Sequence, residues 1–149
     1  VNRGLELTAS GEPMEGLRLL GGVTLMDARV AKSVGGTLDG KLVPGVPTFA
    51  LSLYGEYDLA FITPGLSVNG RVIYSGSTFY DAANTQEVDD WTRVDLGLSY
   101  ETEGPMGKPV EFKAAVENVF DTNYWSASAR GFLAAGAPRT FKVSASMEF

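Results

Sequence analysis

The last ten residues, 140–149, alternate regularly between apolar or small side chains and polar side chains. Successive side chains of a β-strand point to opposite faces of the sheet, so this segment predicts a strand with one apolar and one polar face. Phe141, Val143, Met147 and Phe149 would share the apolar face. Either the core of a soluble sandwich or a lipid bilayer around a barrel with a wet lumen would suit such a strand.

Six further segments alternate with the same period of two and also predict strands. These segments are 5–10, 17–26, 49–59, 66–75, 93–101 and 110–120. Globular strands are most often about five or six residues long, whereas strands that cross a bilayer at a tilt need about nine to eleven. Most of these segments have the greater length, and none of the chain predicts a helix. The sequence therefore predicts an all-β fold, an antiparallel up-and-down meander of about seven strands.

The connections between the expected strands alternate between short and long. The short ones are 11–13, 61–65 and 102–109, and the longer ones are 28–47, 81–90 and 121–138. In an antiparallel meander every second connection lies at the same end, so the long connections would all gather at one end of the sheet. Transmembrane β-barrels have short periplasmic turns and longer extracellular loops, so this alternation favours a membrane barrel.

The composition removes several classes of function. The 149 residues include no Cys and no His, which excludes disulfides, zinc–thiolate sites and Ser-His-Asp triads. The net charge is -6 and the basic residues are scattered, whereas nucleic-acid binding needs clustered Lys and Arg. No apolar run reaches the length of about 18 residues that a transmembrane helix needs. We predict no nucleic-acid partner, no cofactor and no membrane helix.

Several short motifs make the membrane interpretation more specific. The weaker ones are 3–7, 22–28, 43–47 and 91–97, and the strongest are Val116–Trp125 and Gly136–Thr140, followed by a strand that ends at Phe149. Through these motifs the chain resembles the C-terminal part of a TonB-dependent outer-membrane receptor for ferric siderophores, of the ferrichrome-like kind. The resemblance covers nearly all of the chain.

The resemblance implies a location and a set of partners. Such receptors have a barrel of 22 strands, plugged by an N-terminal domain whose contact with the TonB protein supplies energy. Residues 1–149 would be the C-terminal barrel segment, without signal peptide, TonB box or plug, in the bacterial outer membrane. The partners would be an iron–siderophore complex, outer-membrane lipid, and TonB through the missing N-terminal part. The fragment alone would not transport, and its two open strand edges would promote self-association.

Candidate site residues follow from the long loops and from the last strand. An uptake receptor would grip its ligand with aromatic and polar loop side chains, for which the candidates are Tyr80, Trp91, Tyr124, Trp125, Arg130 and Phe132. Phe141, Val143, Met147 and Phe149 would close the barrel, and the terminal aromatic resembles the signal read by the outer-membrane assembly machinery. The glycine-rich stretch 131–136 is expected to be a flexible loop.

Two alternative functions stay open from sequence alone. The first is a self-contained soluble β-sandwich or small barrel that acts as a binding module. The second is an outer-membrane enzyme or a calcium site built on Asp89, Asp90, Asp95 and Glu101. No nucleophile and base are paired in the sequence, so we predict no enzymatic activity, no catalytic residue and no bound metal.

Overall fold

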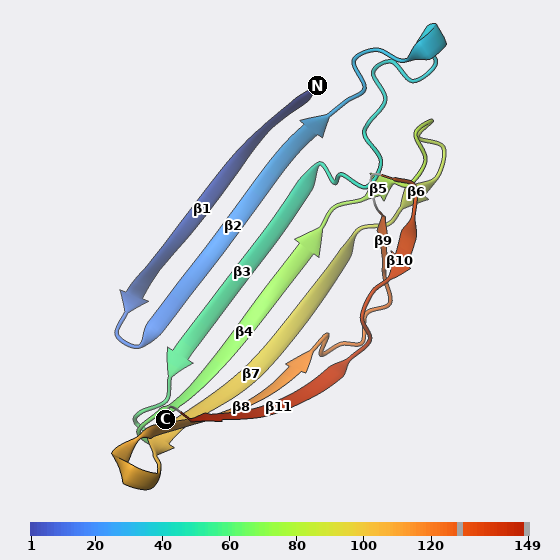
Figure 1. Ribbon diagram of the computed structural model, residues 1–149. Helices are drawn as coiled ribbons and strands as arrows, with labels where there is room; N and C mark the ends of the chain where they lie inside the picture. The colour runs from blue at the N-terminus through green and yellow to red at the C-terminus, as the bar shows by residue number, and fades with distance from the viewer. Residues whose placement is uncertain (128–129, 148–149) are drawn as a thin grey trace.

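The computed structural model describes residues 1–127 and 130–147 and contains one large antiparallel sheet (Figure 1). Its seven strands follow each other in chain order as neighbours. They are β1 (Asn2–Met14), β2 (Leu17–Ala28), β3 (Phe49–Asp58), β4 (Leu66–Ser75), β7 (Trp91–Glu103), β8 (Pro109–Glu117) and β11 (Thr140–Met147). The predicted all-β meander of about seven strands is thereby confirmed.

The strand register places apolar side chains in continuous rows across the sheet. One such row joins Leu7, Val23, Leu51 and Tyr74, each directly opposite the next. At the other edge, Phe141 and Val143 of β11 face Val116 and Ala114 of β8. One face of the sheet is therefore apolar from β1 to β11, as the period of two predicts.

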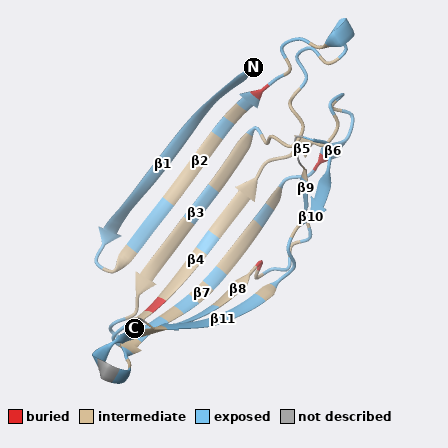
Figure 2. Cartoon of the chain, in the orientation of Figure 1, coloured by how far each residue is buried: buried red, intermediate tan, exposed pale blue. Residues whose placement is uncertain are grey.

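The apolar face is not covered by any other part of the described chain. Leu7 keeps 65% of its surface exposed, Leu53 45%, Phe141 73% and Val143 85% (Figure 2). Of the residues that the structure describes, Ala28, Ser67, Val88 and Asn118 alone are buried. A soluble sandwich would bury these apolar side chains against a second sheet, so the sandwich alternative is not favoured.

The long connections lie at one end of the sheet and the short ones at the other, as predicted. Residues 29–48, 76–90 and 118–139 form the long loops, near the N-terminal end of β1 in Figure 1. Two small hairpins lie within them, β5 (Thr78–Phe79) with β6 (Glu87–Val88) and β9 (Trp125–Ala127) with β10 (Leu133–Ala135). Short 3-10 turns occur at η1 (Val34–Gly36) and η2 (Pro105–Gly107).

The structure corrects three local predictions. The first turn lies at residues 15–16 instead of 11–13, because Gly16 supplies a φ of 76° and its N–H donates to the Glu12 carboxylate. Strand β8 ends at Glu117 instead of continuing to Phe120, because Asn118 adopts a φ of 53°. The stretch 131–136, expected as flexible loop, contains strand β10.

The last strand is present as predicted, within the described part of the chain. Phe141, Val143 and Met147 lie in β11, whereas Phe149 lies outside the described residues. No helix among residues 1–127 and 130–147 has both the length and the apolar content to cross a membrane.

Candidate ligand-binding site

Hydrogen bonds connect two of the long loops. The Asn84 side chain accepts from the Leu42 N–H at 2.7 Å and donates to the Leu42 carbonyl at 3.0 Å, as a neighbouring strand would. The Gly45 N–H donates to the Phe79 carbonyl at 2.8 Å. Loop 29–48 is therefore attached to loop 76–90, which carries the β5–β6 hairpin.

A pocket of about 270 Å³ lies between loop 76–90 and loop 118–139, and we call it the loop-end pocket. Tyr80, Tyr124 and Trp125 give it aromatic surface. Its carboxylates are those of Glu87, Asp89 and Asp90. Three of the six predicted ligand residues thus line one cavity, although they come from two loops about forty residues apart in the chain.

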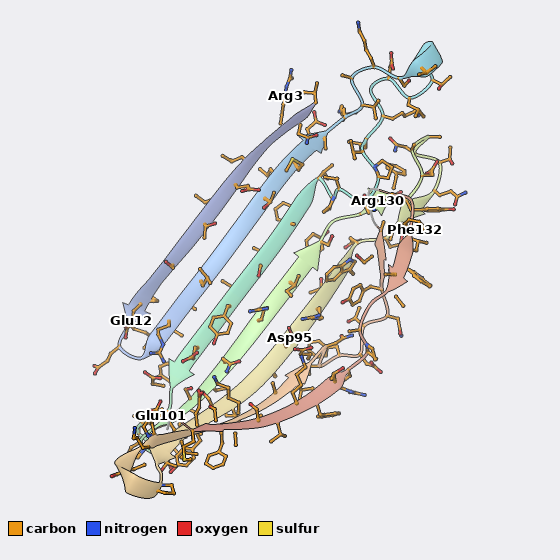
Figure 3. The ribbon with its side chains drawn as sticks, in the orientation of Figure 1. Arg3, Glu12, Asp95, Glu101, Arg130 and Phe132 are labelled. Carbon is orange, nitrogen blue, oxygen red and sulfur yellow. The ribbon has the colours of Figure 1, made fainter. Side chains whose placement is uncertain are left out.

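The other three predicted ligand residues lie elsewhere. Trp91, at the start of β7, stacks on Tyr124 with ring centroids 4.2 Å apart and planes 20° apart, so it supports the pocket wall. Arg130 and Phe132 lie in the turn between β9 and β10, outside the lining of the loop-end pocket (Figure 3). Phe132 keeps 69% of its surface exposed.

Asn118 fixes the start of loop 118–139. It is 1% exposed, and its backbone N–H donates to the Asp95 carboxylate of β7 at 2.9 Å. Its side chain donates to the carbonyls of Thr122 and Ala137, and accepts from the Thr122 N–H. The two strongest sequence motifs therefore meet at this amide, since Ala137 belongs to the second of them.

Asp81 organises the tip of loop 76–90 in a similar way. Its carboxylate accepts hydrogen bonds from the backbone N–H groups of Thr85 and Gln86 and from the Thr85 hydroxyl, at 2.8 to 3.0 Å. Desolvation acts to raise the pKa of Asp81, but these hydrogen bonds outweigh it and lower the pKa below its ordinary value. The charged carboxylate therefore stabilises this turn.

The acidic constellation considered from sequence is not assembled. Asp95 and Glu101 lie far apart along β7 in Figure 3, and Asp95 is paired with Arg93 at 2.8 Å. Asp89 and Asp90 precede β7, at the end where the long loops lie. Within residues 1–127 and 130–147, no group of three or more acidic side chains is arranged to hold a metal ion.

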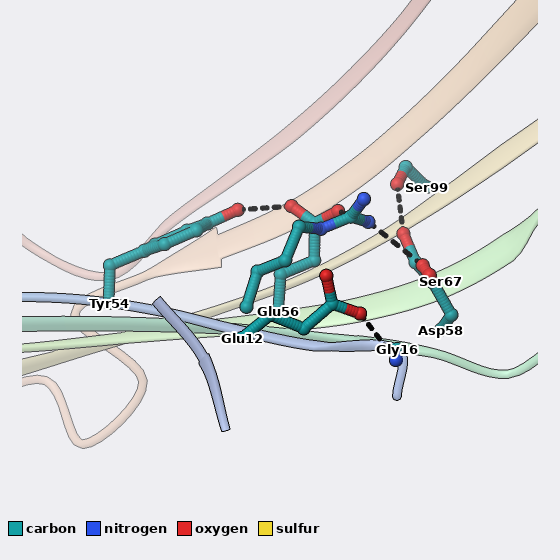
Figure 4. A network of polar contacts seen from close by, with 8 residues as sticks. Glu12, Gly16, Tyr54, Glu56, Asp58, Ser67 and Ser99 are labelled. Carbon is teal, nitrogen blue, oxygen red and sulfur yellow. Dashed lines mark hydrogen bonds and ion pairs between the residues drawn. The ribbon is translucent and has the colours of Figure 1, made fainter. Parts of the chain in front are cut away.

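The polar face carries a second network, near the short turns (Figure 4). The Arg18 guanidinium donates to the Glu56 carboxylate at 2.6 Å and to that of Asp58 at 2.9 Å. Glu56 also accepts from the Tyr54 hydroxyl at 2.6 Å, and Ser67 and Ser99 share a hydrogen bond at 2.7 Å. Paired charges across neighbouring strands suit a face that meets water or other polar groups, opposite to the apolar face.

Sequence reasoning missed several residues that shape this end of the molecule. Gly136 lies against the Tyr124 ring. Asn84 connects two loops that are distant in sequence. The one available signal was that Gly136 and Asn118 stand in the two most specific motifs, which marks the positions without giving their contacts.

Comparison with known proteins gives a consistent result. Residues 1–119 match the family described as TonB dependent receptor-like, beta-barrel. The chain is 37% identical over 150 residues to the ferrichrome receptor FcuA of Yersinia enterocolitica, covering 99% of the chain and 20% of the relative. It superposes on the ferric preacinetobactin receptor BauA of Acinetobacter baumannii with a TM-score of 0.91 and 34% identity, over 99% of the chain and 22% of BauA.

A second solved structure agrees. The siderophore receptor PiuA of Acinetobacter baumannii gives a TM-score of 0.77 at 26% identity, over 97% of the chain and 21% of PiuA. The chain thus spans about a fifth of the length of the proteins it resembles. With its single two-faced sheet, its long loops at one end and its match over 119 residues, the chain belongs to the β-barrel family of TonB-dependent receptors, which are bacterial outer-membrane proteins.

Proposed function

We propose that this chain forms part of the barrel wall and of the extracellular ligand site of a receptor that takes up iron–siderophore complexes. The observation that carries the proposal is the loop-end pocket, in which aromatic and polar side chains from two loops meet at one end of a sheet with an exposed apolar face. The ferrichrome receptor FcuA and the ferric preacinetobactin receptor BauA support this ligand class.

Residues 1–149 constitute, in this proposal, the C-terminal segment of the barrel. The apolar face contacts outer-membrane lipid, and the polar face with the Arg18, Glu56 and Asp58 network lines the lumen. The remainder of the receptor supplies the plug and the contact with TonB. Transport depends on those parts, and no covalent chemistry is carried out by this chain.

The ligand contacts in this proposal come from the predicted set Tyr80, Trp91, Tyr124, Trp125, Arg130 and Phe132. Tyr80, Tyr124 and Trp125 line the pocket directly, so they would contact flat or aliphatic surfaces of the ligand. Carboxylates accept hydrogen bonds and donate none, so Glu87 and Asp89 would meet N–H or O–H groups. Trp91 would contribute through the Tyr124 ring.

Iron uptake by whole cells tests the proposed function. The receptor that contains this chain is expressed in a bacterial strain without its own siderophore receptors, and accumulation of radioactive iron is measured with ferrichrome and with other siderophore complexes. We expect uptake of at least one complex, and its loss when the TonB protein is deleted. No uptake of any complex, or uptake that continues without TonB, would refute the proposal.

A further inference from the structure

The Tyr124 ring is held from the side of strand β7 by Trp91. Trp91 stacks on one face of it, with ring centroids 4.2 Å apart. Trp91 is the first residue of β7 and lies opposite Ser75 of β4, so the sheet fixes its backbone.

Gly136, the residue after strand β10, contacts Tyr124 from another side. Its N–H donates to the Tyr124 carbonyl at 2.8 Å. A Cβ atom added at Gly136 would overlap three atoms of the Tyr124 ring, Cδ1, Cε1 and Cζ. Gly136 does not adopt a positive φ, so the requirement for glycine at this position is one of space and not of backbone conformation.

We propose that Gly136 is a positioning residue that, together with the Trp91 stack, keeps Tyr124 in place as a rigid aromatic wall of the loop-end pocket before any ligand arrives. This inference rests on the proposed function. A side chain that is already ordered loses little conformational entropy when a ligand binds, so preorganisation increases affinity. By contrast with the Tyr124 ring, Trp125, which lines the same pocket, is 56% exposed.

The test uses the whole receptor in detergent with three substitutions. Gly136→Ala places a methyl group where the Tyr124 ring lies, and Tyr124→Phe keeps the ring and removes only its hydroxyl. Gly11→Ala is the matched control, because a Cβ at Gly11 meets nothing within 4 Å and Gly11 has no positive φ. Migration on denaturing gels with and without heating verifies that each barrel is folded.

Near-ultraviolet circular dichroism reports on the Trp91–Tyr124 stack, and quenching of tryptophan fluorescence reports binding of ferrichrome as the probe. For Gly136→Ala we expect an altered aromatic spectrum and roughly three- to tenfold weaker binding, the range that ordering one side chain implies. Tyr124→Phe is expected to weaken binding less and to keep the stacking spectrum. Gly11→Ala is expected to match the wild type.

Failure of this inference and failure of the proposed function give different results. An unchanged spectrum in Gly136→Ala would overturn the positioning role, whether or not ferrichrome binds. Unchanged ferrichrome affinity in Gly136→Ala, with a wild type that binds, would also overturn it. A wild type that takes up no siderophore complex would instead refute the proposed function, while the spectrum still decides how Tyr124 is held.

Discussion

Asn118 shows how one side chain fixes a long loop. Asn tolerates its φ of 53° better than most residues, and its amide both donates and accepts hydrogen bonds. Asn and Asp side chains at the end of a strand commonly form hydrogen bonds with the backbone of the following turn. Asn118 does so with Thr122, and it also contacts Asp95 and Ala137, which sequence alone could not predict because those residues are distant in the chain.

Replacement of Asn118 is expected to destabilise the barrel. Asn118→Ala removes three side-chain hydrogen bonds at a buried position, which corresponds to about 2–4 kcal/mol of unfolding free energy. Asn118→Gly removes the same bonds without the strain of a positive φ, so it should lose slightly less. Urea unfolding of the receptor in detergent measures both variants. Equal stability of the wild type and the two variants would contradict the assigned contacts.

Asp81 predicts a pH dependence for the tip of loop 76–90. Its pKa is lower in the folded protein than in the unfolded chain, so its stabilising effect is present above the unfolded pKa of about 3.9 and is lost as pH falls through the lower folded value. We expect the Thr85 and Gln86 amides to stay protected from hydrogen exchange at neutral pH and to lose protection only in strong acid. In Asp81→Asn the protection should be weaker and independent of pH in this range.

At the scale of elements, strand position was predictable and turn position was less so. A period of two identifies each long strand, because a shift by one residue would exchange the two faces. The hairpins β5–β6 and β9–β10 were not predicted, because strands of two or three residues leave no periodic signal. The first turn was misplaced because Pro13 lies within edge strand β1, next to a register shift, where a missing N–H is tolerated.

The two faces of strand β3 are expected to respond oppositely to a charge. Leu53 lies on the apolar face near the middle of β3, and its neighbour Ser52 lies on the polar face. Leu53→Arg should cost about 2–4 kcal/mol of folding free energy in lipid, as charged residues do near the bilayer midplane. Ser52→Arg is the matched control and should fold nearly as well as the wild type. Folding into vesicles, followed by gel migration with and without heating, measures both.

At the scale of the whole molecule, the sheet has two faces but no core of its own. The sequence predicted the apolar face and the end where the loops gather, and both are present. The loop-end pocket could be predicted only as a set of loop aromatics, because its shape depends on contacts such as Gly136 with Tyr124 that join separate segments. The candidate ligand residues therefore form three groups: some line the pocket, one supports its wall, and others lie in a turn outside it. Only the folded chain reveals this division.

The open sheet gives a prediction for residues 1–149 on their own. Strands β1 and β11 form its two edges, and each has one side without a partner strand in the described chain. Unpaired edges and a wide apolar face both favour association with other chains in water. We expect the isolated chain to form large oligomers in buffer and smaller, detergent-bound particles in micelles, as measured by size-exclusion chromatography with light scattering. A dispersed monomer in buffer would mean that the apolar face is covered within the chain, which would contradict the lipid-facing assignment.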